Sequence, residues 1–183
     1  IKKEHFLEIG PGQGALTKIL AKGIRRLDAV ELDKDLLLGL RLINSEELFI
    51  HNENILDFDI KKVLENGKLR IVGNLPYNIS TDIMLWAFLN LNHFEDMHFM
   101  FQKEFGERLS ARPNNKSYGR ISVITQYLTE LETVLYLEPE SFKPKPKVKS
   151  VFIRFIPKKN RKKDSQISIK LQAVTKEVFQ HRR

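Results

Sequence analysis

Short apolar runs alternate with stretches of helical periodicity along the first 110 residues, and this alternation limits the choice of fold more than any other feature. We place strands at residues 5–9, 27–32, 48–51, 69–73 and 97–101. Helices are predicted between and after them, at 15–22, 33–42, 81–91 and 103–110. Such alternation indicates an α/β fold with a mostly parallel sheet, which binds ligands at the carboxyl ends of its strands.

The pattern changes beyond residue 110. Residues 121–128 fit either a helix or a buried strand, whereas 133–137 and 151–156 alternate as an antiparallel pair would. With this pair the sheet is predicted to have seven strands. We expect one domain over residues 1–157, and a linker followed by the start of a second, helical unit over 158–183.

Charge and residue types narrow the function classes. Residues 143–183 hold 14 Lys and Arg against 2 Asp and Glu, whereas residues 1–142 hold 17 against 21. A basic segment indicates a phosphate-rich partner, although a solvated tail and an anionic membrane surface remain alternatives. The chain has no cysteine, which excludes disulfides, thiolate catalysis and Cys-ligated zinc and fits a cytoplasmic protein. No membrane span, signal peptide or metal site is predicted.

A glycine-rich loop lies between the first strand and the first helix, with Gly10, Gly12 and Gly14 in G-x-G-x-G spacing. This differs from the G-x-G-x-x-G of dinucleotide-binding enzymes, and a purely structural turn is the alternative. Glu31 ends the second strand, where a carboxylate can accept both hydroxyls of a ribose. Taken by itself, Glu31 would be interpreted as a surface residue at a strand end. Together with the glycine-rich loop, it indicates a nucleoside-containing cofactor.

Glu8 favours one such cofactor. A carboxylate is unfavourable beside a pyrophosphate but suits S-adenosylmethionine, which has an amino acid end and a positive centre. After the third strand, Asn54 can meet the adenine amino group and Ile55 can flank the ring. Asp57 is the second choice, and a plain turn is the alternative. The predicted cofactor residues are Glu8, Gly10, Gly12, Glu31, Leu32, Asn54, Ile55 and Asn74.

The stretch "VGNLPYNIST" places a polar corner at the end of the fourth strand. The Asn74 side-chain oxygen and the backbone carbonyl of Leu75 or Pro76 can accept hydrogen bonds from a target adenine amine. This aims the nitrogen lone pair at the methyl group, while Tyr77 offers a ring on which the base stacks. As a Pro-containing turn alone the corner would be unremarkable.

Five segments together resemble one family: "EIGPGQGALT", "VELD", "GNLPYNIST", "FQKEFGERLSARPNNKSYGRISVITQY" and "SFKPKPKVKS". The chain resembles the ribosomal RNA adenine N6,N6-dimethyltransferases, in particular the bacterial small-subunit enzymes. The resemblance implies a Rossmann-like class I S-adenosylmethionine-dependent methyltransferase fold. It also implies dimethylation of two adjacent adenosines near the 3′ end of 16S rRNA, in the immature small subunit, by a monomer.

The resemblance carries the cofactor role to Gly10, Glu31, Asn54 and Asn74, and the catalytic corner to residues 74–77. The family usually has Asp where this chain has Asn54, so we expect weaker cofactor binding. We also expect the chain to be a piece that lacks an N-terminal segment and most of a C-terminal helical domain.

RNA contacts are predicted on two segments. Phe142 is expected to stack on the target base opposite Tyr77, as a further catalytic residue. The cations expected to meet phosphates are Arg108, Arg112, Arg120, Lys143, Lys145 and Lys147. The alternative is a stiff connector with solvated charges.

Four further functions are considered. One is an RNA-binding assembly factor of the small subunit in which methylation is secondary, and the sequence does not rank it below the enzyme. A 23S rRNA adenine methyltransferase is disfavoured by the basic Pro-rich stretch and the appended unit. A DNA adenine methyltransferase is poorly supported, and a dehydrogenase is disfavoured by the glycine spacing.

Overall fold

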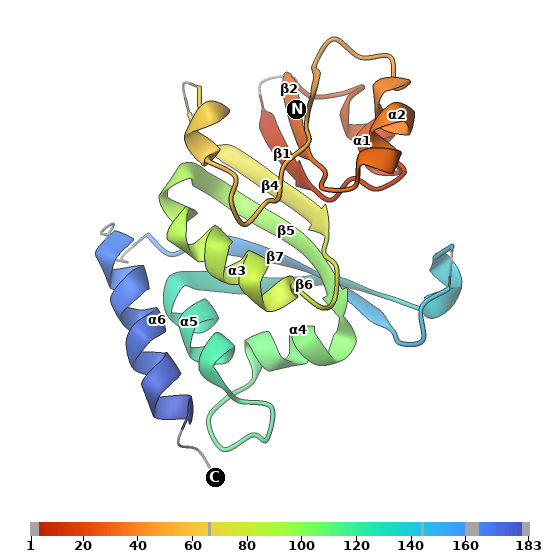
Figure 1. Cartoon of the computed structure of the whole chain (residues 1–183). Coiled ribbons are helices and arrows are strands. Elements are labelled where there is room, and N and C mark those ends of the chain that lie inside the picture. The colour runs from red at the N-terminus through yellow and green to blue at the C-terminus, as the bar shows by residue number, and fades with distance from the viewer. Residues whose placement is uncertain (1–3, 66, 144, 160–164, 181–183) are drawn as a thin grey trace.

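Seven strands form one sheet in the order β3–β2–β1–β4–β5–β7–β6, which confirms the predicted α/β fold (Figure 1). The computed structural model describes residues 4–65, 67–143, 145–159 and 165–180. Strands β1 to β5 run parallel, whereas β7 pairs antiparallel with both β5 and β6. The strands are β1 (His5–Ile9), β2 (Arg26–Val30), β3 (Leu48–His51), β4 (Leu69–Asn74), β5 (Phe94–Gln102), β6 (Thr129–Leu137) and β7 (Ser150–Pro157).

Helices cover both faces of the sheet. They are α1 (Thr17–Leu20), α2 (Lys34–Arg41), α3 (Ser80–Leu89), α4 (Lys103–Ser110), α5 (Arg120–Leu128) and α6 (Ser165–Gln180), with 3-10 turns η1 (Ile60–Lys62), η2 (Leu91–His93) and η3 (Pro139–Ser141). A small apolar cluster around Leu27 joins α1 to β2, and the main core lies on the other face, under α3, α4 and α5. The carboxyl ends of β1 to β4 therefore meet at one edge between these two layers.

One predicted helix is shorter than expected, and one ambiguous stretch takes the helical alternative. The helix expected over 15–22 is confined to α1, because residues 12–16 continue the turns of the glycine loop. The ambiguous stretch 121–128 is helical, as α5. Its side chains bond α4, since Gln126 Nε2 donates to the Leu109 carbonyl at 3.1 Å and Ser122 Oγ to the Arg108 carbonyl at 2.5 Å.

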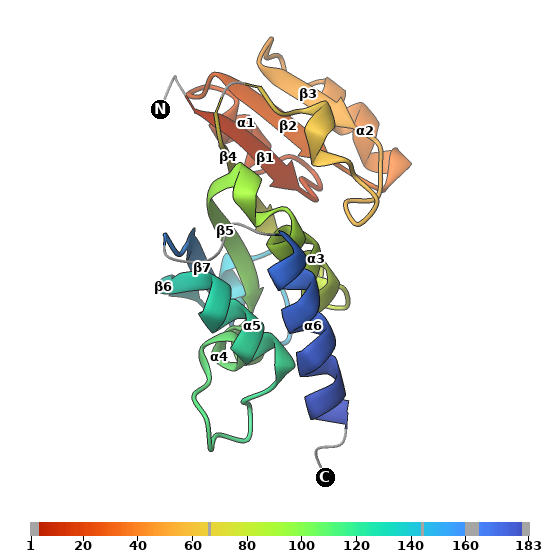
Figure 2. The same cartoon turned by 90° about the vertical axis from the view of Figure 1, so that its left-hand side faces the viewer.

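Helix α6 lies alongside α3 and α5 (Figure 2). Leu171 packs against the main core, and Gln172 Nε2 lies 3.5 Å from the Leu85 carbonyl. The helix thus packs on the sheet domain, and the division at residue 157 stays a prediction because the linker residues 160–164 lie outside the described residues. Within the described segments, no helix is both long and apolar enough to cross a membrane.

Candidate active site at the carboxyl edge of the sheet

A cavity of about 280 Å³ opens at the carboxyl ends of β1, β2 and β4. Five of the predicted cofactor residues line it: Gly10, Glu31, Leu32, Asn54 and Ile55. Pro76 of the predicted corner lines it too, so the cavity extends from the predicted cofactor residues to the edge of the corner, although Asn74 and Tyr77 are not part of its lining. Its apolar wall includes Ile79 and Ile83, whose part in the site the sequence reasoning missed, since nothing but their place in space distinguishes them from core residues.

Two backbone N–H groups fix the carboxylate of Glu31 at the edge of the cavity. It is buried, and its Oε2 accepts the Gly12 backbone N–H at 3.0 Å while its Oε1 accepts the Asp33 N–H at 2.9 Å. Gly12 reaches this position with a φ of +58°, which favours glycine. Each carboxylate oxygen keeps one acceptor position, so Glu31 can still accept two hydroxyls.

Gly14 has a different role from Gly12. Its φ is +77°, and a Cβ there would lie 2.8 Å from the Cδ1 of Ile43. The third glycine of the loop is therefore favoured mainly by its backbone conformation, as the structural alternative predicted. The loop combines a binding turn with a structural one.

Asn52 braces the end of β2 from the neighbouring strand. Its Nδ2 donates to the carbonyls of Glu31 at 2.8 Å and Leu32 at 3.1 Å, and the His51 carbonyl accepts the Glu31 N–H at 2.9 Å. The sequence reasoning missed Asn52, although an Asn directly after a strand next to a predicted ligand residue was a usable signal.

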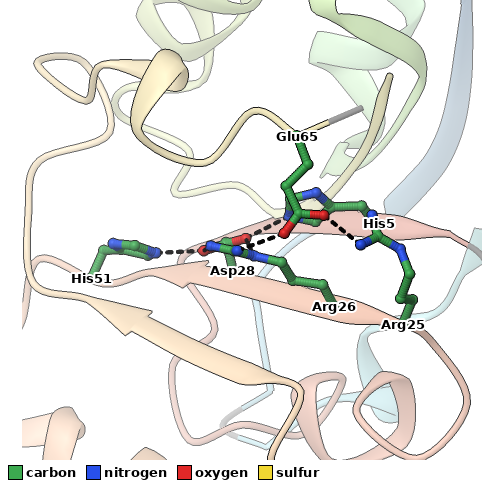
Figure 3. Close-up of polar contacts among 6 residues, drawn as sticks. All are labelled: His5, Arg25, Arg26, Asp28, His51 and Glu65. Atoms are coloured by element: carbon green, nitrogen blue, oxygen red, sulfur yellow. Dashed lines mark hydrogen bonds and ion pairs between the residues drawn. The ribbon is translucent and has the colours of Figure 1, made fainter. Parts of the chain in front are cut away.

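A buried charge cluster is centred on Asp28, in the middle of β2 (Figure 3). Asp28 has no exposed surface, and its two oxygens meet His51 Nε2 at 2.7 Å, His5 Nε2 at 2.5 Å and Arg26 Nε at 2.7 Å. Burial opposes ionisation, but the hydrogen bonds from His5, His51 and Arg26 hold the pKa of Asp28 well below its usual range. Glu65 closes the outer side by pairing with Arg25 and Arg26. The cluster ties β1, β2 and β3 together.

Glu8 is a second buried carboxyl, 3% exposed, beside the glycine loop. Its Oε2 has no hydrogen-bond partner among the described residues. Burial raises the pKa of the Glu8 carboxyl to about 7; the Thr17 hydroxyl opposes part of the rise, and the Glu31 carboxylate adds to it. A buried carboxyl with one unpartnered oxygen fits a cationic group that would arrive with a ligand.

Asn54 and Asp57 form a pair after β3. Asn54 Nδ2 donates to Asp57 Oδ2 at 3.1 Å, and the Leu56 N–H donates to Asn54 Oδ1 at 3.1 Å. The first and second choices for adenine recognition are therefore in contact with each other.

The corner after β4 separates its two candidate carbonyls. The Pro76 carbonyl accepts Ser80 Oγ at 2.9 Å and the Ile79 N–H at 3.3 Å, which engages both of its lone pairs. No described residue donates to the Leu75 carbonyl. Asn74 and Tyr77 are exposed, whereas the Leu75 side chain is buried and fixes the turn. The geometry therefore leaves the Leu75 carbonyl, and not that of Pro76, available to a substrate.

The predicted RNA-contacting residues fall into two groups. Arg108 and Arg120 line one cavity of about 520 Å³ together with Lys116, between α3, α4 and α5, and Arg112 is exposed nearby on the following loop. In the stretch 143–149, Lys145 pairs with Glu140 at 2.5 Å and Lys149 with Glu138 at 2.7 Å. These acidic partners, which the sequence reasoning missed, offset part of the basic charge, while Lys143 and Lys147 are exposed.

Phe142 is half-buried, and among the described residues no ring contact joins it to Tyr77. Its stacking role stays a prediction. A wider cavity of about 1100 Å³ lies between α1 and α2 but is lined by none of the predicted site residues, so volume alone does not locate the site.

Comparisons with known proteins agree with this geometry. A model of the family described as "Ribosomal RNA adenine dimethylase" matches residues 2–183. The "Ribosomal RNA small subunit methyltransferase A" of Buchnera aphidicola is 42% identical, over 98% of this chain and 67% of its own length. A solved dimethyladenosine transferase from Plasmodium falciparum has a TM-score of 0.81 at 23% identity, covering 100% of this chain and 65% of that one.

A second solved structure, the 23S rRNA methyltransferase ErmE, has a TM-score of 0.72 at 26% identity, covering 96% of this chain and 70% of that one. The chain thus spans about two thirds of the length of the relatives it matches.

Proposed function

The chain belongs to the ribosomal RNA adenine dimethylase family, and on that premise we propose that it transfers methyl groups from S-adenosylmethionine to N6 of adenosines in ribosomal RNA. The observation that carries the proposal is the shared cavity. Glu31 and Asn54 line it from the cofactor side and Pro76 from the corner, so donor and acceptor would meet there.

The residues present fit the cofactor. Glu8 offers an unpartnered carboxylate to a cationic amino acid end, Glu31 offers two acceptor positions to a ribose, and Asn54 faces an adenine with Ile55 beside it. When bound, S-adenosylmethionine supplies a methyl group on a positively charged sulfur. The chain supplies binding, alignment and an environment that tolerates the charge.

The corner positions the acceptor amine. The Asn74 side-chain oxygen and the Leu75 carbonyl accept its two hydrogens, which keeps the nitrogen lone pair free for the methyl group. Tyr77 stacks on the base, and Phe142 covers its other face. Pro76 has no N–H to offer, and its carbonyl is held by Ser80 and Ile79, so the corner stays rigid.

We further propose that the substrate is 16S rRNA in the immature small subunit, that two adjacent adenosines near its 3′ end are each dimethylated, and that the enzyme is a cytoplasmic monomer. The Buchnera relative, named for the small subunit, is 42% identical, whereas ErmE, named for 23S rRNA, is 26% identical. The cavity of Arg108, Lys116 and Arg120, with Arg112 beside it and the exposed Lys143 and Lys147, would take backbone phosphates. Lys145 would first have to leave Glu140.

The test uses the full chain, labelled S-adenosylmethionine and small ribosomal subunits lacking the modification, with the product nucleoside identified. We expect N6,N6-dimethyladenosine in 16S rRNA, formed roughly 100-fold more slowly by Asn74→Ala, as when one preorganised hydrogen-bond partner is removed. The exposed Asn44→Ala serves as control. Binding to the subunits without any transfer would contradict the enzyme and favour the assembly factor.

A further inference from the structure

Two fixed partners orient the side-chain amide of Asn54. The Asp57 carboxylate, which only accepts, lies 3.1 Å from Nδ2, and the Leu56 backbone N–H, which only donates, lies 3.1 Å from Oδ1. An amide with its nitrogen and oxygen exchanged would face a donor with a donor and an acceptor with an acceptor. The position of the Asn54 oxygen is therefore determined by its neighbours.

Both contacts arise within one turn. The Asp57 N–H donates to the Asn54 carbonyl at 3.0 Å, which brings the two side chains to the same side of the chain. Ile55 between them is buried and lines the cavity, so the turn itself is anchored. Asp57 is exposed, and its carboxylate is free of other ion pairs among the described residues.

The hydrogen-bonding positions that remain free on the Asn54 amide match those of an adenine. Its oxygen has used one of two acceptor positions, and its nitrogen has used one of two hydrogens. One acceptor and one donor are left. Adenine presents an amino donor next to a ring-nitrogen acceptor, which is the pair that an Asn amide recognises.

We propose that Asp57 is a positioning residue for cofactor recognition, which holds the Asn54 amide so that its Oδ1 accepts a hydrogen bond from the adenine amino group. The inference rests on the proposed function. It modifies the expectation that Asn54 in place of Asp weakens cofactor binding, because the pair keeps a carboxylate one hydrogen bond behind the amide. That carboxylate polarises the amide and increases the negative charge on its oxygen.

The test exchanges the two residues. Asp57→Asn removes the charge that fixes the amide, and Asn54→Asp places two carboxylates in contact, so each change should raise the Kd for S-adenosylhomocysteine about fivefold or more. The double variant Asn54→Asp/Asp57→Asn restores one carboxylate and one amide, and should return to within about twofold of the unchanged protein. Affinities are measured by calorimetry on the full chain, and thermal unfolding without ligand shows that each variant is folded.

A second ligand separates positioning from a merely structural role. S-inosylhomocysteine carries an oxygen where adenine has its amino group, so it should bind the unchanged protein roughly tenfold more weakly. In Asp57→Asn, the ratio of the Kd for S-inosylhomocysteine to the Kd for S-adenosylhomocysteine should be smaller than in the unchanged protein. Equal losses for both ligands would mean that Asp57 only stabilises the turn, and would overturn the inference.

Glu31→Ala distinguishes the inference from its premise. If Glu31→Ala weakens S-adenosylhomocysteine binding while Asp57→Asn leaves it unchanged, the cofactor site stands and the role of Asp57 is wrong. If neither change affects binding, the proposed cofactor site is wrong and the inference is overturned with it.

Discussion

The carboxylate of Glu31 accepts the backbone N–H of Gly12 across 3.0 Å, which fixes the loop after β1 against the end of β2. With the Asp33 N–H on its other oxygen, Glu31 is orientated by backbone alone. The position of the Glu31 carboxylate therefore depends on the backbone of the glycine loop and of the end of β2.

This bond predicts the effect of Glu31→Gln. One backbone N–H would then face the amide nitrogen of Gln, and one acceptor for the ribose would be lost, so we expect the Kd for S-adenosylhomocysteine to rise about tenfold. Glu46→Gln, which changes an exposed carboxylate, is the matched control. Calorimetry that finds the same affinity for both variants would contradict the role of Glu31.

Asn52→Ala tests the brace between β3 and the end of β2. It removes two hydrogen bonds to the Glu31 and Leu32 carbonyls, so we expect a loss of about 1 kcal/mol in the free energy of unfolding. Because those carbonyls set the Glu31 side chain, the Kd for S-adenosylhomocysteine should also rise severalfold. Urea unfolding and calorimetry measure the two effects, with the exposed Asn44→Ala as control; equal values for both variants would refute the brace.

The strands β1, β2 and β4 were predictable because they are buried on both faces. Leu7 and Leu27 are fully buried in runs of apolar residues, and such runs between turns have few alternatives. The start of α1 was not predictable, because the turns of the glycine loop extend to residue 16 and leave four residues of helix. The helical state of 121–128 depends on bonds to α4, which no local pattern contains.

The site was predictable where it follows from topology. Parallel strands end at one edge, so Gly10, Glu31 and Asn54 had to lie near one another. Residues whose role depends on contacts across the chain were missed. Asn52 matters because it reaches the carbonyls of β2, and Glu140 because it pairs with Lys145.

Glu8 predicts a pH dependence of stability. Its pKa is raised from 4.5 to about 7, so the folded chain binds more protons than the unfolded chain between these values. The stabilisation is complete below about pH 4.5 and is lost as the pH rises through 7, on the order of 3 kcal/mol in all. Glu8→Gln, which stays neutral, should therefore be the more stable protein at pH 8 and nearly equal at pH 4.5.

Urea unfolding at the two pH values measures this difference. The control is Glu47→Gln on the exposed stretch before β3, which should leave the pH dependence unchanged. A Glu8→Gln protein that keeps the full pH dependence would show that another group causes it.

Asp28 predicts the opposite pH dependence of stability, and its replacement should destabilise the fold. Its pKa is lowered, so its stabilisation is present above the ordinary value of 3.8 and is lost as the pH falls towards the lower value in the folded chain. At pH 7, Asp28→Asn leaves His5, His51 and Arg26 converging on a neutral buried group, and we expect a loss of about 3 kcal/mol in the free energy of unfolding.

Glu65→Gln is the matched control, because Glu65 pairs with Arg26 in the same cluster but at the surface, and should cost less than about 1 kcal/mol. Urea unfolding at pH 7 compares the two variants. Similar losses of unfolding free energy in the two variants would mean that the buried Asp28 stabilises the fold no more than the surface Glu65. A large loss for Asp28→Asn alone would show that one buried carboxylate ties three strands together. The affinity of this variant for S-adenosylhomocysteine should then fall as well, because the His51 carbonyl accepts the Glu31 N–H at 2.9 Å.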